Sequence, residues 1–200
     1  MKLRFSTTSP FARKARVVAL ETGQEAALEL VKTVTTDSAS GLAQDNPLSK
    51  IPVLILDNGE KLYDSPVICE YLDNCHKGAP LFPMAGPRRW TALRRQALAD
   101  GMMDAAVLRM YERRRPENLR SSDWDAAQKA RVTRGLAAFE AEAGQLGEQP
   151  DIGNLTVAIL LDYLDFRFSD ENWRNGHPHL AAWHKSFSAR PSLASTRPHD

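Results

Sequence analysis

Hydrophobic and polar residues alternate in short stretches along the first part of the chain. Residues 2–6 predict a short strand, and after Ser9-Pro10 apolar side chains recur at helical spacing until Gly23, a residue type that commonly ends helices. Residues 28–34 alternate again, so strand, helix and strand follow one another within the length of a βαβ unit. We therefore expect the first two strands to be parallel.

The next stretch predicts a second strand-rich segment. Residues 35–50 are rich in Thr, Ser, Asp and Gly and predict an irregular connection, and "IPVLIL" predicts a buried strand. Asn58-Gly59 indicates a two-residue hairpin turn. Ser65-Pro66 then repeats Ser9-Pro10, with the hydroxyl expected at the helix cap, and the helix is expected to run to about Cys75.

The remainder of the chain has a helical pattern. Residues 76–87 contain three prolines and two glycines and predict a linker. Helices are expected over 88–115, 123–146 and 155–168, the third apolar nearly all round and hence central, and a last helix carries Leu180, Trp183 and Phe187. The predicted fold is an α/β domain over 1–77, a linker over 78–87 and an all-α domain over 88–200.

Composition and charge exclude several classes of function. A chain of 200 residues with 42% apolar content can bury a core, and a formal charge of +1 gives no global attraction to nucleic acid or membranes. The N-terminus lacks the apolar core of a secretory signal, and no apolar run approaches the roughly 20 residues that span a bilayer, so we expect a soluble cytoplasmic protein. Cys69 and Cys75 are expected on different faces of one helix, without a disulfide.

Three histidines near the C-terminus raise the question of a metal site. His177, His179 and His184 lack a matched set of cysteine or acidic ligands, so we predict no metal. His177-Pro178 is expected to open the last helix.

Four segments carry a family resemblance. "SPFARKAR", "NPLSKIPVLILDNG", "LYDSPVICEYL" and "HPHLAAWHKSFSARPS", in this order and spacing, resemble the cytosolic glutathione S-transferase family over essentially the whole chain, most closely small bacterial members that begin with a Thr-Ser-Pro-Phe element. The resemblance implies a thioredoxin-like domain that holds glutathione, a helical domain that helps to form a pocket for an electrophile, and a homodimer. Family membership alone does not fix the reaction.

Ser9 is the candidate catalytic residue. A hydroxyl at a helix N-terminus can donate to a glutathione thiolate where the helix dipole also favours negative charge, although Ser9 suits the role of a simple cap equally well. Thr8 offers a second hydroxyl. Relatives that exchange disulfides carry a cysteine here, and a serine forms no mixed disulfide, so transferase or isomerase chemistry is favoured.

The resemblance assigns further residues to glutathione binding. It implies a cis Pro52 that exposes the backbone of Val53 for pairing with the cysteinyl part, and a contact of Lys50 with the glycyl carboxylate. Asp64 and Ser65 begin a helix suited to the γ-glutamyl group, with a plain cap as the alternative. The complete predicted set is Phe11, Lys50, Ile51, Pro52, Val53, Asp64 and Ser65.

The long helix of the second domain carries candidates of another kind. Asp100 or Asp104 is a candidate to reach glutathione across a dimer interface, and Met103 and Tyr111 are candidates to line the electrophile pocket or to belong to the core. Eight arginines lie between residues 88 and 115. We interpret them as a solvated helix face rather than as a site for an anion or a nucleic acid.

The family pattern also concerns the start of the buried helix. It places a hydroxyl at the cap and an acid three residues later, whereas here Ile159 follows Thr156 at that distance, so Asn154 is a candidate for the cap.

We therefore expect a glutathione S-transferase-like enzyme that joins the glutathione thiolate to a small electrophile, as in detoxification. A glutathione-dependent isomerase or peroxidase uses the same thiolate. A non-catalytic descendant that serves as a binding or regulatory module is the alternative from another class.

Overall fold

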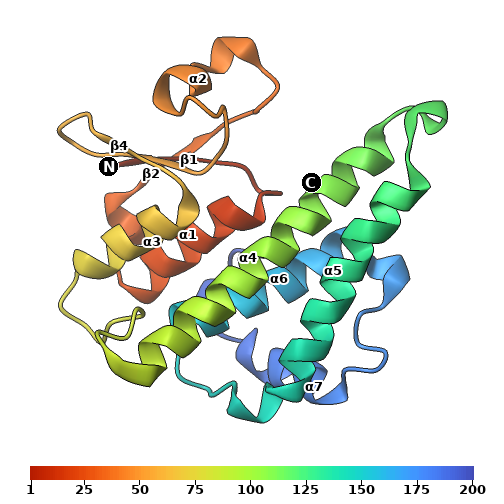
Figure 1. The fold of residues 1–200 in the computed structure, drawn as a ribbon. Coiled ribbons are helices and arrows are strands. Elements are labelled where there is room, and N and C mark those ends of the chain that lie inside the picture. Colours follow the sequence, from red (N-terminus) through yellow and green to blue (C-terminus); the bar gives the residue numbers. More distant parts are fainter. The chain divides into compact units, whose positions relative to one another are not determined.

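The structure is a computed structural model that describes residues 1–200, and the chain forms two compact units (Figure 1). Unit 1 comprises Met1–Gly86 and Arg190–Asp200, and unit 2 comprises Pro87–Ala189. These units differ from the predicted domains in two respects: unit 1 takes in residues 78–86 of the predicted linker, and the last residues of the chain return to unit 1. They are tied there by Arg190, which donates two hydrogen bonds to Glu21.

Unit 1 is a mixed four-stranded sheet with helices against it. The strand order is β2-β1-β3-β4, with β1 parallel to β2, as predicted, and the other pairs antiparallel. Figure 1 shows α1 and α3, which pack against each other, side by side below the sheet. The elements are β1 (Lys2–Phe5), α1 (Pro10–Glu21), η1 (Glu25–Ala27), β2 (Glu29–Lys32), η2 (Ser38–Ser40), α2 (Leu42–Asp45), β3 (Val53–Ile55), β4 (Lys61–Leu62), α3 (Ser65–Asn74) and α8 (Pro191–Ala194).

The turns of unit 1 follow from local sequence. Gly23 follows Thr22, the C-cap residue of α1, and has φ +70°, as expected of a helix-ending glycine. The hairpin loop is longer than the predicted two residues: the N–H of Gly59 donates to the O of Leu56, and Gly59 has φ +86°. This is a turn of Asp57 and Asn58 followed by a left-handed glycine, the common three-residue alternative.

Unit 2 is entirely helical. Its elements are α4 (Gly86–Arg114, which starts at the boundary), η3 (Glu117–Leu119), α5 (Ser122–Ala141), η4 (Ala143–Gln145), α6 (Ile152–Arg167), η5 (Ser169–Glu171) and α7 (Pro178–Phe187). Every residue of α6 from Ile152 to Leu164 is buried, which confirms the third long helix as the centre of this unit. None of the helices has both the length and the apolar character that crossing a bilayer requires.

The start of α6 corrects a prediction about its cap. Asp151 is the cap residue, and its carboxylate accepts from the N–H of Asn154 at 2.8 Å. Thr156 lies inside the helix, where its hydroxyl donates to the O of Ile152 at 2.6 Å. A carboxylate caps a helix as well as a hydroxyl does, so Asp151 is the cap, five residues before Thr156, where the family pattern indicated it.

Candidate functional site

Ser9 lies where β1 gives way to α1, and it caps that helix. Its hydroxyl oxygen accepts from the N–H of Ala12 at 3.2 Å, and Pro10 is the first helical residue, as predicted. A capping hydroxyl uses a lone pair, which leaves its own hydrogen available for donation. The capping role and a thiolate contact are therefore compatible. Phe11 is half-buried in the first turn of α1, and the Thr8 hydroxyl lies 3.4 Å from that of Ser6.

The basic residues that follow Ser9 have structural roles. The guanidinium of Arg13 is buried and donates to the O of Leu193 at 2.9 Å and to the hydroxyl of Thr196 at 3.2 Å. Lys14 is fully buried, and Arg16 lies over the ring of Phe5 at 5.1 Å. Arg13 therefore fastens the returning C-terminal segment to α1.

A cis peptide bond joins Ile51 to Pro52, as the resemblance implied. The N–H of Leu56 donates to the O of Glu60, on the β4 side of β3. Because peptide groups alternate in direction along a strand, the N–H and C=O of Val53 point to the other side, toward β1. Val53 thus uses its peptide groups within the sheet. Ile51 lies outside the ladder, and no hydrogen bond of the chain uses its N–H or C=O.

Asn46 is a residue that the sequence analysis missed. It is buried in the loop before Pro52, where its side chain donates to the O of Lys50 at 2.9 Å and accepts from the N–H of Leu48 at 3.0 Å. The Asn-Pro pair in "NPLSKIP" was the available signal, because asparagine commonly organises turns in this way. Asn46 holds the backbone that leads to the cis bond, whereas the side chain of Lys50 is exposed.

The start of α3 differs from the prediction by one residue. Asp64, not Ser65, is in the cap position, and its exposed carboxylate makes no capping hydrogen bond. Ser65 is the first helical residue, is 1% exposed, and its hydroxyl has no partner within the chain. The first chain-internal bond of the helix is from the N–H of Ile68 to the O of Asp64, so the N–H groups of Ser65 and Val67 are unsatisfied.

These groups fit a carboxylate. Two free N–H groups and a buried hydroxyl converge at the positive end of a helix dipole, which favours an anion. The Asp64 carboxylate beside them suits an ammonium group. A ligand with both an ammonium and a carboxylate on one carbon matches this end of α3.

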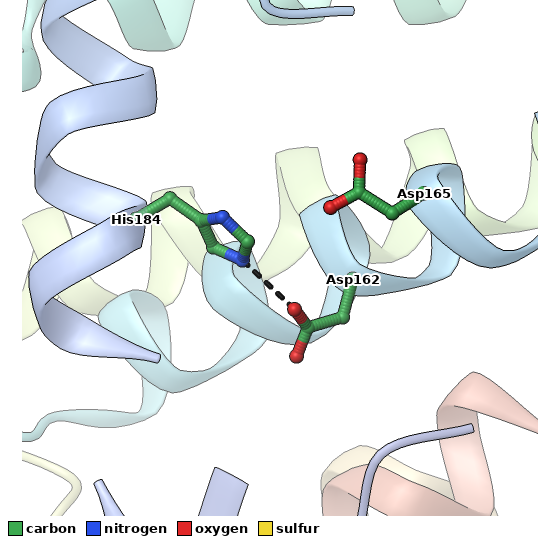
Figure 2. Close-up of side chains that lie close together, drawn as sticks. All are labelled: Asp162, Asp165 and His184. Atoms are coloured by element: carbon green, nitrogen blue, oxygen red, sulfur yellow. Dashed lines mark hydrogen bonds and ion pairs between the residues drawn. The ribbon is translucent and has the colours of Figure 1, made fainter. Parts of the chain in front are cut away.

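Unit 2 contains one cluster with metal-ligand chemistry. Donor atoms of Asp162 and Asp165 on α6 and His184 on α7 lie within 4.8 Å of one another (Figure 2). His184 Nε2 is 2.9 Å from Asp162 Oδ1. Both carboxylate oxygens of Asp165 accept from the guanidinium of Arg174, and one also accepts from Trp173 Nε1. Arg174 therefore pairs with Asp165 as a metal ion would, and the contact between Asp162 and His184 joins α6 to α7.

The other candidate residues of unit 2 differ in how deeply they are buried. Met103 is fully buried and belongs to the core, whereas Tyr111 is exposed. Asp100 is half-buried and Asp104 is exposed, and both interact within the chain. His177 is at the cap position of α7 and so opens that helix as predicted, although the short α8 follows it.

Comparison with known proteins identifies the family. The family model "Glutathione S-transferase, N-terminal domain" matches residues 3–80, and "Glutathione S-transferase, C-terminal domain" matches residues 104–186. The chain is 32% identical to the uncharacterized GST-like protein YibF of Escherichia coli K12, over 99% of this chain and 98% of that protein.

Solved structures agree. A glutathione transferase family member from Pseudomonas fluorescens Pf-5 with bound glutathione is 45% identical, with a TM-score of 0.95 over 100% of this chain and 99% of that one. A second structure from the same source, with bound S-(propanoic acid)-glutathione, has a TM-score of 0.92 and 44% identity over the full length of both chains. The sheet of unit 1, the helical unit 2 and these matches together show that the chain belongs to the glutathione S-transferase family.

Proposed function

We propose that this protein binds glutathione in unit 1 and transfers it to an electrophilic small molecule. The observation that carries the proposal is the start of α3, where the hydroxyl and N–H of Ser65 and the N–H of Val67 are left without partners inside the fold. A γ-glutamyl carboxylate would satisfy all three groups, and Asp64 would balance the adjacent ammonium. The two structures of the Pseudomonas family member, with bound glutathione and with its conjugate, support this assignment.

The rest of the tripeptide follows from the neighbouring backbone. The unused N–H and C=O of Ile51 would pair with the cysteinyl residue like an added strand, beside the cis Pro52 and the sheet residue Val53. Lys50 is exposed and would meet the glycyl carboxylate, and the half-buried Phe11 would offer apolar contact.

Ser9 would activate the thiol. Its hydroxyl hydrogen is not needed for capping, so it can donate to the thiolate at the positive end of α1. A free thiol with a pKa of about 8.5 is only a few per cent ionised at neutral pH. Each pKa unit by which Ser9 and the helix lower this value stabilises the thiolate by about 1.4 kcal/mol.

The transfer step itself is a simple substitution or addition. The thiolate forms a carbon–sulfur bond and the leaving group departs with its electron pair, or an activated double bond is saturated and takes up a proton. Ser9 cannot form a mixed disulfide, which disfavours disulfide exchange. S-(propanoic acid)-glutathione, which is bound in the second Pseudomonas structure, is a glutathione S-conjugate of the kind that this step would form.

Titration calorimetry with reduced glutathione tests the proposal. We expect saturable binding that weakens at least tenfold, about 1.4 kcal/mol, in Ser65→Ala. Ser122→Ala is the matched control, because Ser122 is likewise the first residue of a helix but follows a side-chain cap, Ser121. Ser9→Ala should retain glutathione binding and raise the pKa of the bound thiol. This pKa is measured from the absorbance of the thiolate as a function of pH.

A folded protein that binds no glutathione at millimolar concentration would refute the proposal and favour the non-catalytic alternative. A homodimer, which we also propose from family membership, is checked by sedimentation of the same samples.

A further inference from the structure

Unit 2 contains a cavity that is formed by its own helices alone. The cavity has a volume of about 180 Å³ and lies between α5, the C-terminal end of α6 and the segment that joins α6 to α7. All of its lining residues fall between 129 and 177, whereas the candidate glutathione-binding residues belong to unit 1. A ligand of this cavity would therefore be held without any contribution from unit 1.

The inner wall of the cavity is apolar. Val132 and Leu136 lie on one face of α5 at a spacing of four, and Leu164 and Phe168 have the same spacing at the end of α6. Trp173 completes the wall, and each of these five residues is at most 6% exposed. Such a wall favours a ligand whose body is apolar.

The segment 171–177 forms the remaining wall, and hydrogen bonds hold it in place. Trp173 Nε1 donates to Asp165 Oδ1 at 2.8 Å, so the indole presents its ring rather than its N–H to the cavity. The carboxylate of Glu171 accepts from Arg109 Nη2 at 2.6 Å. Because the chain makes these contacts by itself, the cavity is preformed, as small-molecule sites usually are.

His177 lines the cavity with one ring nitrogen available. Its Nδ1 is 2.6 Å from the carbonyl oxygen of Trp173. A carbonyl oxygen only accepts hydrogen bonds, so Nδ1 carries the hydrogen and Nε2 of the neutral ring is an acceptor. This Nε2 has no partner within the chain. The cavity therefore combines an apolar wall with a free imidazole acceptor.

The charged groups at the cavity are paired with one another. Lys129 Nζ is 3.5 Å from Glu171 Oε2, and Arg109 and Arg113 also donate to this carboxylate. A bound carboxylate would have to compete with Glu171 for these cations, and a bound ammonium group would meet their repulsion. The pairing therefore favours a neutral ligand.

We propose that this cavity binds a small neutral phenol, with the aromatic ring against the apolar wall and the hydroxyl donating a hydrogen bond to His177 Nε2. An apolar cavity of about 150 Å³ holds benzene, so the cavity of unit 2 has room for one ring with a short substituent. The inference goes beyond the proposed function, because the site requires neither glutathione nor a chemical step.

Two ligands of similar size test the proposal. 4-Methylphenol carries the hydroxyl donor, and 4-fluorotoluene has fluorine in its place. Each is titrated into the full chain without glutathione, and the indole N–H signal of Trp173, assigned with Trp173→Phe, is followed by heteronuclear NMR. We expect a saturable shift with a Kd about tenfold lower for 4-methylphenol than for 4-fluorotoluene.

Substitutions at the acceptor separate the hydrogen bond from the apolar contact. His177→Phe should remove the preference for 4-methylphenol and leave the Kd of 4-fluorotoluene unchanged. His179→Phe is the matched control, because it makes the same change at a nearby exposed histidine that does not line the cavity. The preference should survive in this variant.

A substitution on the inner wall tests the cavity itself. Val132→Phe should fill the space and abolish the binding of both ligands, while the affinity for glutathione stays that of the unmodified protein. If Val132→Phe does not fold, Thr133→Trp closes the cavity from an exposed position and serves the same purpose. The absence of a saturable shift at Trp173, equal Kd values for the two ligands, or binding that persists in the filled variant would overturn the proposal. None of these outcomes bears on glutathione binding, which is measured separately.

Discussion

Two glycines inside helices of unit 2 should respond in opposite ways to the same substitution. A Cβ on Gly153 in α6 would lie 2.6 Å from the carbonyl oxygen of Ala92 and 2.8 Å from the Cβ of Arg95, both on α4. A Cβ on Gly101 in α4 would meet nothing within 4 Å. Gly153 is therefore the point at which the two helices touch through their backbones, and Gly101 is a helical glycine without a packing role.

The magnitudes follow from two opposing effects. Alanine is favoured over glycine inside a helix by roughly 0.5–1 kcal/mol, so Gly101→Ala should stabilise the protein by that amount. At Gly153 the same gain is outweighed, because the obstructing atoms belong to the main chain of Ala92 and to a Cβ, which cannot rotate away. Overpacking of this kind costs about 1–3 kcal/mol or more. A net destabilisation of about 1–2 kcal/mol is expected.

Urea unfolding followed by tryptophan fluorescence measures this difference. All four tryptophans, Trp90, Trp124, Trp173 and Trp183, belong to unit 2, so the signal reports on the unit that carries both glycines. The midpoint should rise for Gly101→Ala and fall for Gly153→Ala at a similar slope. If Gly153→Ala were as stable as Gly101→Ala, the close approach of α4 and α6 on which the argument depends would be refuted.

Two further predictions concern Arg109, which is 1% exposed. Arg109→Met should destabilise the protein by about 2–3 kcal/mol in the same assay, because it leaves the partly buried Asp125 and Glu171 without their cation; an unchanged midpoint would contradict this. Although burial opposes the shift, the hydrogen bond from Arg109 helps to hold the pKa of Glu171 below its ordinary 4.5. The resulting contribution to the free energy of unfolding is present above pH 4.5 and is lost as the pH falls through the lowered pKa of Glu171 in the folded protein. In Glu171→Gln, stability should therefore fall less steeply with decreasing pH.

Local signals in the sequence predicted much of unit 1. Ser9-Pro10 begins α1 and Gly23 follows its end because capping and left-handed turns depend on adjacent residues alone. The parallel pairing of β1 and β2 followed from the length of the connection between them. The family resemblance supplied the cis Pro52, which the general frequency of cis bonds alone did not favour.

Other features depended on information that the local sequence does not hold. The direction of the peptide groups of Val53 is set by its register with Arg4, which is distant in sequence, so the role of Ile51 became visible only with the sheet. The structural role of Arg13 was likewise hidden, because its partners, Leu193 and Thr196, lie at the other end of the chain. Charge along a sequence does not reveal which charges are already paired.

The starts of the longer helices offer a final comparison. Side chains of Ser9, Ser121 and Asp151 cap α1, α5 and α6, and Glu140 accepts from two N–H groups at the start of α7. At α3 a carboxylate and a hydroxyl are adjacent to the same kind of helix end, yet neither accepts from its first turn. A capping bond contributes about 1 kcal/mol, so leaving it unmade costs stability that a bound carboxylate would restore. The composition of Asp64-Ser65 alone cannot distinguish a cap from a ligand site, whereas the unused N–H groups favour the ligand.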